Sequence, residues 1–314
     1  MIVLSLFDGM TCGKLALEAI GMKPKVYYAS EVDKFAIAES KANHPDVKHL
    51  GCVTKWREWG INWSSVDLLI GGSPCQGFSL TGKRLAFDDP RSALFFVYVD
   101  ILNHIKRVNR KIKFMLENVK MKKDHLSIIT EYLGVKPIFI NSELVSAQKR
   151  QRYYWCNWNV EQPSDRGIML RDILECEGVG LLRRDGKWRI KNDKSHCILA
   201  NYHKGLDNKA QRTVVLEMKP RGKFKGGQIT LDGKAPTMTA CSWQENFKLT
   251  DGNGKYRKLT VVECCRLQGV PDDYFKISSN TQAYKMLGNG WQVCTVKHIF
   301  KALRSELLGL TAWI

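Results

Sequence analysis

The amino-acid sequence predicts an α/β fold, a mostly parallel sheet with helices on both faces, into which a smaller and irregular second domain is inserted. Two observations support this prediction. Over the first 155 residues, short apolar runs alternate with stretches whose apolar residues recur at helical spacing, the pattern of a parallel sheet. From 157 to 255 that periodicity weakens and Gly, Lys and Arg dominate, which is typical of a separate insertion.

The individual elements follow from these patterns. Runs rich in β-branched and aromatic residues predict strands over 2–7, 25–30, 66–72, 112–118, 137–145 and 152–158. Helical spacing predicts helices over 14–21, 33–43, 91–108, 258–269 and 292–309. Gly21 is the stop signal of the first helix, and Asp33 is the expected N-cap of the second. The predicted division is 1–156 for the first part of the large domain, 157–255 for the inserted domain, and 256–314 for the return to the large domain.

The charge is strongly basic and unevenly placed. The chain has 49 Lys and Arg against 31 Asp and Glu, a net charge of +18, and residues 181–258 alone hold 18 against 7, a net +11. A charge spread over the surface for solubility is the plain alternative, but its clustering favours a polyanionic partner.

The ten cysteines form no disulfide framework, because no Cys-x-x-Cys spacing is present and the one close pair is Cys264 next to Cys265. The first apolar run meets Asp8 after seven residues, which disfavours a secretory signal, and no run of eighteen apolar residues occurs. We therefore expect reduced thiols, mostly in the core, in a cytoplasmic protein without a membrane span or a metal site.

The first candidate site is the stretch "LSLFDGMTCGKLAL", which predicts a strand, a glycine-bearing turn and a helix. Gly9 lets the backbone approach a ligand closely. Glu31 ends the next strand, about twenty residues later, where a carboxylate suits the two hydroxyls of a ribose. The pair indicates an adenosine-containing cofactor, although a tight connection alone would also produce such a turn.

The second candidate is Cys75 in "GGSPCQGFS", at the carboxyl end of the strand predicted over 66–72. A buried structural cysteine is the default interpretation. However, Pro74 fixes the backbone, Lys83 and Arg84 create an electropositive setting that favours a thiolate, and Glu117 ends a neighbouring strand. A nucleophilic thiolate beside a carboxyl that can hold a proton suits attack on an electron-poor ring.

Eight blocks occur in an order typical of one family: "LFDG", Glu31, "GGSPCQGFS", "DDPRSALFF", "ENV", "QKRQR", "LTVVECCRLQGVPD" and "LGNGWQV". On these blocks the chain resembles the DNA (cytosine-5) methyltransferases over nearly its whole length, in particular short bacterial and phage members, with similarity to the vertebrate de novo branch. The resemblance implies a Rossmann-like S-adenosylmethionine-dependent methyltransferase fold. It further implies methyl transfer to C5 of cytosine in a specific duplex DNA sequence after base flipping.

The resemblance also assigns roles. Cys75 would add to cytosine C6, Glu117 would hold a proton at N3, Arg152 would assist at the base, and Arg150 is its neighbour in the same block. S-adenosylmethionine would contact Phe7, Asp8, Gly9, Met10, Thr11, Glu31, Val32, Cys52, Val53, Pro74, Leu94, Asn289, Gly290 and Trp291. The inserted domain would recognise the target, and 76–92 would be a loop that closes behind the flipped base. DNA contacts are expected at Gln76, Ser79, Thr81, Gly82, Lys83, Arg84, Asn118, Arg221, Lys223, Lys225, Gln228, Thr237, Met238 and Thr239. An ordinary solvated turn is the equal alternative for 221–228.

Two positions depart from the family pattern. Cys52 stands where an Asp is expected to bind the adenine amino group, and Thr11 and Cys12 stand where many relatives have two glycines. The resemblance implies that the partners are double-stranded DNA and a cognate restriction enzyme. It also implies that the enzyme is a monomer. Two alternatives stay open at this point. An RNA-directed relative is disfavoured because its Cys-Phe-Thr signature is absent, and a silent DNA-binding homologue is disfavoured because Pro74-Cys75 and "ENV" are kept.

Overall fold

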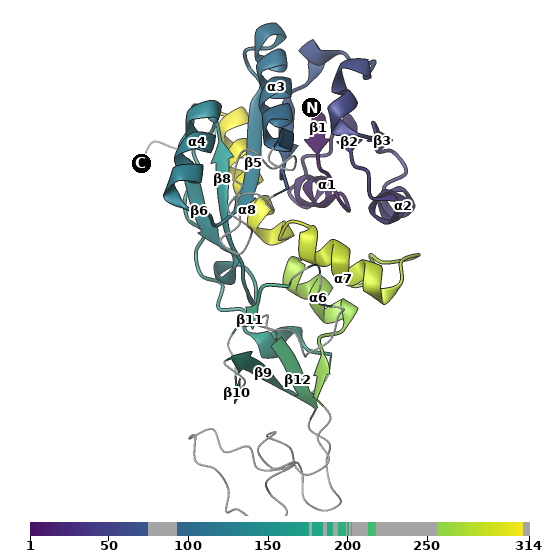
Figure 1. Ribbon diagram of the computed structural model, residues 1–314, viewed down its shortest axis with the longest axis vertical. Helices are drawn as coiled ribbons and strands as arrows, with labels where there is room; N and C mark the ends of the chain where they lie inside the picture. Colours follow the sequence, from purple (N-terminus) through teal and green to yellow (C-terminus); the bar gives the residue numbers. More distant parts are fainter. Residues whose placement is uncertain are drawn as a thin grey trace, which may run out of the picture.

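The computed structural model describes residues 1–74, 93–175, 178–184, 187–190, 194–198, 200, 202, 213–217 and 256–309 of the 314-residue chain. Its centre is a seven-stranded sheet in the order β3-β2-β1-β4-β5-β8-β6 (Figure 1). The strands are β1 (Ile2–Leu6), β2 (Val26–Ser30), β3 (Lys48–His49), β4 (Leu68–Gly71), β5 (Lys113–Val119), β6 (Pro137–Asn141) and β8 (Gln151–Cys156). β1 to β5 are parallel, and β8 is antiparallel to both β5 and β6. The mixed, mostly parallel sheet is the one that the sequence predicts.

Alternate residues of the central strands enter two separate apolar layers. In β1, Val3 belongs to one core cluster, whereas Leu4 and Leu6 belong to the other. In β4, Ile70 and Leu69 divide in the same way. Because both faces are covered, these strands are apolar almost throughout, as central parallel strands usually are.

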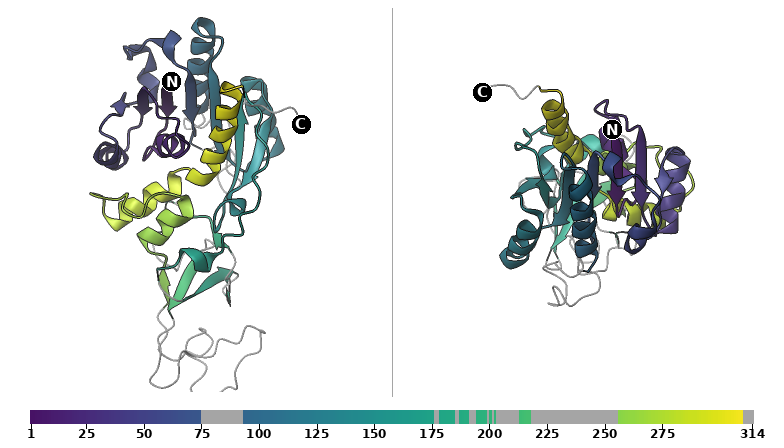
Figure 2. Two further views of the ribbon diagram at one scale, coloured as in Figure 1. Left: turned by 180° about the vertical axis from the view of Figure 1, so that it is seen from behind. Right: turned by 90° about the horizontal axis from the view of Figure 1, so that it is seen from above.

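Helices cover both faces (Figure 2). One face carries α1 (Cys12–Glu18), α6 (Val261–Gln268), α7 (Asn280–Asn289) and α8 (Val293–Leu307), with α2 (Lys34–Asn43) near the sheet edge, and the other carries α3 (Ala93–Val108) and α4 (Lys123–Leu133). Short 3-10 turns occupy Val53–Glu58, Trp63–Ser65, Ser142–Leu144 and Leu170–Ile173. Asp33 is the N-cap of α2, as predicted, and accepts the N–H of Phe35 at 3.0 Å.

The chain beyond residue 256 returns to the large sheet. α8 lies along the face that also carries α1, and the Arg304 guanidinium donates to the carbonyl of Ile20 at 2.9 Å. Lys113 at the start of β5 pairs with Glu306 at the end of the same helix. The α/β body is therefore assembled from two segments that are far apart in the sequence.

The inserted segment is less irregular than the sequence predicts. Its described part contains an antiparallel sheet of order β10-β9-β12-β13, formed by β9 (Gly178–Arg184), β10 (Lys187–Ile190), β12 (Thr213–Glu217) and β13 (Tyr256–Lys258). β13 lies just past the boundary predicted at 255. The short pair β7 (Gln148–Lys149) and β11 (Ser195–His196) joins this segment to the large domain (Figure 1). None of these strands shows a regular apolar–polar alternation, because β9, β10 and β13 contain several basic residues and β12 is a short apolar run, so the sequence signal for them is weak.

Four further differences concern the large domain. α4, α7 and the two-residue β3 were not predicted, and the strand expected over 137–145 ends at Asn141. The Asn141 side chain accepts the N–H groups of Glu143 and Arg150, at 3.4 and 3.0 Å, which stabilises the turn that follows.

Among the residues that the structure describes, none of the helices has the length and the apolar character that a membrane span requires. The same residues contain no group of three or more His, Cys, Asp or Glu side chains placed to hold a metal.

Candidate functional site

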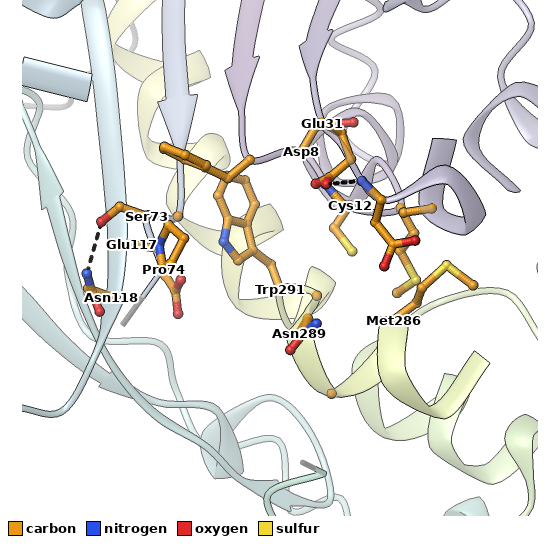
Figure 3. A pocket seen from close by; sticks show the side chains of 18 of the residues that line it. Asp8, Cys12, Glu31, Ser73, Pro74, Glu117, Asn118, Met286, Asn289 and Trp291 are labelled. Atoms are coloured by element: carbon orange, nitrogen blue, oxygen red, sulfur yellow. Dashed lines mark hydrogen bonds between the residues drawn. The ribbon is translucent and has the colours of Figure 1, made fainter. Parts of the chain in front are cut away.

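A cavity of about 320 Å³ opens at the carboxyl ends of β1, β2, β4 and β5 (Figure 3). Connections from the sheet leave in opposite directions on the two sides of the β1–β4 boundary, and such a switch point is where open α/β sheets bind ligands. Its size is within the range of small-molecule sites. It is lined by Phe7, Asp8, Gly9, Met10, Cys12, Glu31, Asp33, Ala36, Gly72, Ser73, Pro74, Glu117, Asn118, Val119, Arg150, Arg152, Met286, Gly288, Asn289, Gly290 and Trp291.

The turn after β1 has an unusual backbone that Glu31 holds in place. Phe7 and Thr11 have positive φ angles of 58° and 65°, which non-glycine residues rarely adopt. The Glu31 carboxylate accepts the N–H of Gly9 at 2.8 Å through one oxygen, and the N–H groups of Val32 and Asp33 at 2.7 and 2.8 Å through the other. Glu31 therefore fixes the shape of both strand ends before any ligand arrives, and its oxygens still border the cavity.

Asp8 lines the cavity, and one of its carboxylate oxygens is buried. The Tyr27 hydroxyl donates to Asp8 Oδ1 at 2.7 Å, whereas the buried Oδ2 has no hydrogen-bond partner among the described residues. Burial raises the pKa of Asp8 to about 6. A buried carboxylate oxygen without a partner is costly, so a cationic ligand group would be favoured at this point.

Glu117 and Arg152 meet because of the register between β5 and β8. Glu117 lies opposite Tyr154, and Arg152 lies two residues along the partner strand, on the same face of the sheet. Arg152 Nε is 2.9 Å from Glu117 Oε1, and both side chains are mostly buried at the cavity. The Arg152 guanidinium fixes the direction of the Glu117 carboxylate. A fixed direction is what a carboxyl group needs if it is to hold a proton at one defined ligand atom.

The turn that leads to Cys75 is fixed from β5. The Asn118 amide donates to the Ser73 hydroxyl at 3.2 Å, and its carbonyl oxygen accepts the N–H of Val119 at 2.8 Å (Figure 3). Asn118 is buried and its side chain supports the turn, and the residue also lines the cavity, so the DNA contact suggested by the sequence stays a prediction. Cys75 itself lies outside the described residues.

Trp291 lies in the middle of the cavity. Figure 3 shows its indole between Asp8 and Cys12 on one side and Pro74 and Glu117 on the other. A Cβ on Gly72 would come within 2.8 Å of the indole Nε1 and 3.0 Å of Glu117 Oε2. The close approach of the ring to β4 therefore requires glycine at position 72.

Cys12 places a thiol at this cavity, but it is not a nucleophile at neutral pH. Burial, together with the nearby charge of Asp8, raises its pKa to about 12. Burial likewise raises the pKa of Cys265 to about 12 and that of Cys156 further. Thiols in such settings stay protonated and inert.

Arg150, predicted beside Arg152 as a catalytic residue, lines the cavity, and its guanidinium is hydrogen-bonded to backbone carbonyls. It is buried and donates to the carbonyls of Gly288 and Gly290 at 3.2 and 2.8 Å. Its other terminal nitrogen, Nη1, donates to Cys197 Sγ at 3.2 Å and to the carbonyl of Ile198 at 3.4 Å. The structure thus places it as a link between chain segments.

The structure brings most predicted cofactor residues together and leaves some apart. Those that line the cavity are Phe7, Asp8, Gly9, Met10, Glu31, Pro74, Asn289, Gly290 and Trp291, whereas Thr11, Val32, Cys52, Val53 and Leu94 are not among its lining residues. Thr11 is buried and donates to Ser40 Oγ at 2.5 Å, and Val53 belongs to the core on the α3 side. Cys52 Sγ lies 3.1 Å from Thr54 Oγ1, a contact that lowers the pKa of the thiol.

Sequence reasoning missed several lining residues, of which Ala36, Met286 and Gly288 have no chemical signature that would identify them. The predicted DNA contacts other than Asn118 lie outside the described residues; they are Gln76, Ser79, Thr81, Gly82, Lys83, Arg84, Arg221, Lys223, Lys225, Gln228, Thr237, Met238 and Thr239.

Comparison with known proteins agrees with this geometry. Residues 1–305 match the family model described as C-5 cytosine-specific DNA methylase. The chain is 32% identical over 305 residues to the Type II methyltransferase M1.ScrFI of Lactococcus lactis subsp. cremoris, covering 91% of this chain and 73% of that protein. It is 29% identical over 331 residues to the Type II methyltransferase M.HhaI of Haemophilus parahaemolyticus, covering 97% and 94%.

Solved structures show the same fold. A DNMT2 mutant from Spodoptera frugiperda superposes with a TM-score of 0.65 at 19% identity, covering 96% of this chain and 99% of that one. The Entamoeba histolytica methyltransferase EhMeth superposes with a TM-score of 0.67 at 15% identity, covering 98% of each chain.

Proposed function

Since the chain belongs to the C-5 cytosine-specific DNA methylase family and is a DNA (cytosine-5) methyltransferase, we propose how its own residues carry out this reaction. The methyl donor is S-adenosylmethionine, held between the turn after β1 and the end of α7. The target cytosine is flipped from the duplex and enters the part of the cavity bordered by Pro74, Glu117 and Arg152. The proposal rests mainly on one observation: the residues proposed to bind the methyl donor and those proposed to bind the cytosine line the same cavity.

The residues that line the cavity fit the methyl donor, S-adenosylmethionine. The unsatisfied Oδ2 of Asp8 suits the ammonium group of its methionine part, and the Glu31 carboxylate at the end of β2 suits the ribose hydroxyls. Bound there, S-adenosylmethionine supplies an electrophilic methyl group on its sulfonium. Position 52, where an Asp was expected, offers a thiol already in contact with Thr54, so the adenine depends on other groups.

The base is activated by the protein. Cytosine C5 is a weak nucleophile, and addition of the Cys75 thiolate to C6 converts the ring to an enamine whose C5 is electron-rich. Glu117, oriented by Arg152 at 2.9 Å, holds the proton at N3 while charge develops there. Once C5 carries the transferred methyl group, loss of the C5 proton to solvent and elimination of the Cys75 thiolate from C6 restore the aromatic ring.

Sequence recognition is assigned to the inserted segment 157–255, with 1–156 and 256–314 forming the catalytic domain. The concentration of net charge +11 within 181–258 supports this assignment, because phosphate contacts supply most of the affinity for DNA. We further propose that 76–92 closes over the flipped base and that the enzyme acts as a monomer. A cognate restriction enzyme is supported by relatives named Type II methyltransferases.

The two alternatives have less support. The family model and the curated relatives are DNA methylases, which favours DNA over RNA as the substrate. The retained Glu117–Arg152 pair argues against a silent homologue.

Expression of the chain in a host that lacks cytosine methylation is expected to place 5-methylcytosine at one sequence in plasmid DNA. Bisulfite sequencing detects the modification and identifies the sequence in one experiment. The matched control is the Cys75→Ser variant expressed at the same level. Complete conversion of all cytosines in plasmids from cells that contain soluble protein would overturn the proposal.

Binding of S-adenosylmethionine is expected to weaken as the pH falls through about 6. The pKa of Asp8 is raised by burial to about 6, so acid removes the charge that the ligand ammonium needs. For one such group the dissociation constant should rise about tenfold between pH 7 and pH 5. Calorimetric titration at the two pH values measures the change, and Asp8→Asn should bind weakly at both. Equal affinities of the wild type at pH 5 and pH 7 would refute this role of Asp8.

A further inference from the structure

Arg150 joins two segments that belong to different functional parts. One terminal nitrogen of its guanidinium, Nη2, donates to the carbonyls of Gly288 and Gly290, and the other, Nη1, reaches Cys197 and the carbonyl of Ile198. The side chain is 3% exposed. A guanidinium can bind on both sides at once because its donors are spread over a rigid plane, which a lysine ammonium lacks.

The first segment is the end of α7, which borders the cofactor cavity. Carbonyls in the last turn of a helix have no partner within the helix, and a positive charge there is favoured by the helix dipole. Gly288 and Gly290 supply such carbonyls, and residues 288–291 all line the cavity. Arg150 therefore fixes the backbone that carries Asn289 and Trp291.

The second segment is β11 and the residues after it, which lie within the segment proposed to recognise DNA. Ser195 N–H donates to the carbonyl of Ala147 at 2.7 Å, and Ile198 N–H donates to Gln148 Oε1 at 2.9 Å. The buried Lys194 ammonium donates to the carbonyls of Glu143, Ser146 and Ile168. Residues 194–198 are thus held firmly against the strand that leads into Arg150.

We propose that Arg150 is a positioning residue that couples cofactor binding to DNA binding, by holding the cofactor loop 288–291 and the recognition segment 194–198 in one arrangement. The inference rests on the proposed function of both segments. A ligand that orders one segment also reduces the conformational freedom of the other segment. The second ligand then loses less conformational entropy when it binds. Coupling of this kind is reciprocal, so DNA must tighten cofactor binding by the same factor as the cofactor tightens DNA binding.

The first test measures the dissociation constant of S-adenosylhomocysteine by calorimetry, with and without a duplex carrying the sequence found by bisulfite sequencing. In the wild type, DNA is expected to tighten binding by at least about fivefold. In Arg150→Lys and Arg150→Met this factor is expected to approach one. A merely structural role would weaken both affinities and leave their ratio unchanged, so an unchanged ratio overturns the proposal.

Arg266→Lys is the matched control. Arg266 also donates to a backbone carbonyl, that of Ile173 at 3.1 Å, and so joins α6 to the inserted segment without touching the cofactor loop. The variant is expected to keep the wild-type ratio. If Arg266→Lys removes the coupling as fully as Arg150→Lys does, the specific role of Arg150 is refuted.

A second measurement needs no variant. Hydrogen exchange of the wild type with S-adenosylhomocysteine alone is expected to slow by several-fold in the peptide that contains residues 194–198, including the amides of Ser195 and Ile198. Unchanged exchange there, with protection of residues 288–291, would overturn the coupling while leaving the proposed function intact. Failure of the wild type to bind S-adenosylhomocysteine at all would instead overturn the proposed function, and the coupling with it.

Discussion

The Cys75→Ser variant is expected to lose methyl transfer almost completely, by at least about 10⁴-fold, while its affinity for DNA stays within a few-fold of the wild type. Serine is nearly isosteric with cysteine, but its hydroxyl is not ionised at neutral pH and adds poorly to C6. Burial keeps Cys12, the described thiol in the cavity, protonated, so it cannot replace Cys75. Transfer of tritiated methyl groups to plasmid DNA measures the loss.

The control for this experiment is Cys294→Ser, which changes a half-buried thiol that does not line the cavity and should retain activity. Wild type should also form a complex with DNA containing 5-fluorocytosine that survives denaturing electrophoresis. Fluorine takes the place of the C5 hydrogen and cannot leave as a cation, so the elimination that releases the cysteine is blocked. Turnover by Cys75→Ser at a rate comparable to the wild type would exclude the covalent mechanism.

Glu117→Gln is expected to lower the turnover number by about 10²- to 10⁴-fold, the usual effect of removing a general acid or base. The amide keeps the size of the side chain but cannot deliver a proton to N3, and it loses the charge that pairs with Arg152 at 2.9 Å. Single-turnover kinetics with saturating DNA and cofactor separate this loss from any change in binding.

Asp272→Asn serves as the control for loss of a carboxylate paired with an arginine, because Asp272 pairs with Arg266 at 2.7 Å in a more exposed ion pair and neither residue lines the cavity. It should leave single-turnover rates near those of the wild type. If Glu117→Gln weakened DNA binding a hundredfold at an unchanged turnover number, Glu117 would be a binding residue and its proposed chemical role would be wrong.

Local patterns in the sequence were sufficient for the body of the fold and for the chemistry of the site. Strands such as β1 and β4 are buried on both faces, so their apolar runs are nearly unbroken and easy to recognise. The N-cap at Asp33 and one oxygen of the Glu31 carboxylate act on backbone groups within two residues of themselves. Such short-range interactions leave a signature in the order of residues, as do the family's blocks.

The tertiary structure alone decided how distant segments meet. Arg150 finds its carbonyl partners at Gly288 and Gly290, 138 and 140 residues away, and its neighbour Arg152 faces Glu117 only because of the β5–β8 register. Asn118 reaches Ser73 because β5 lies beside β4, and Ser73 follows the end of β4. The raised pKa of Asp8 likewise follows from its burial in the folded chain, which no single stretch of sequence encodes. Roles that depend on desolvation or on a partner across the fold are set by packing, whereas roles that depend on residue type and local backbone are set by the sequence.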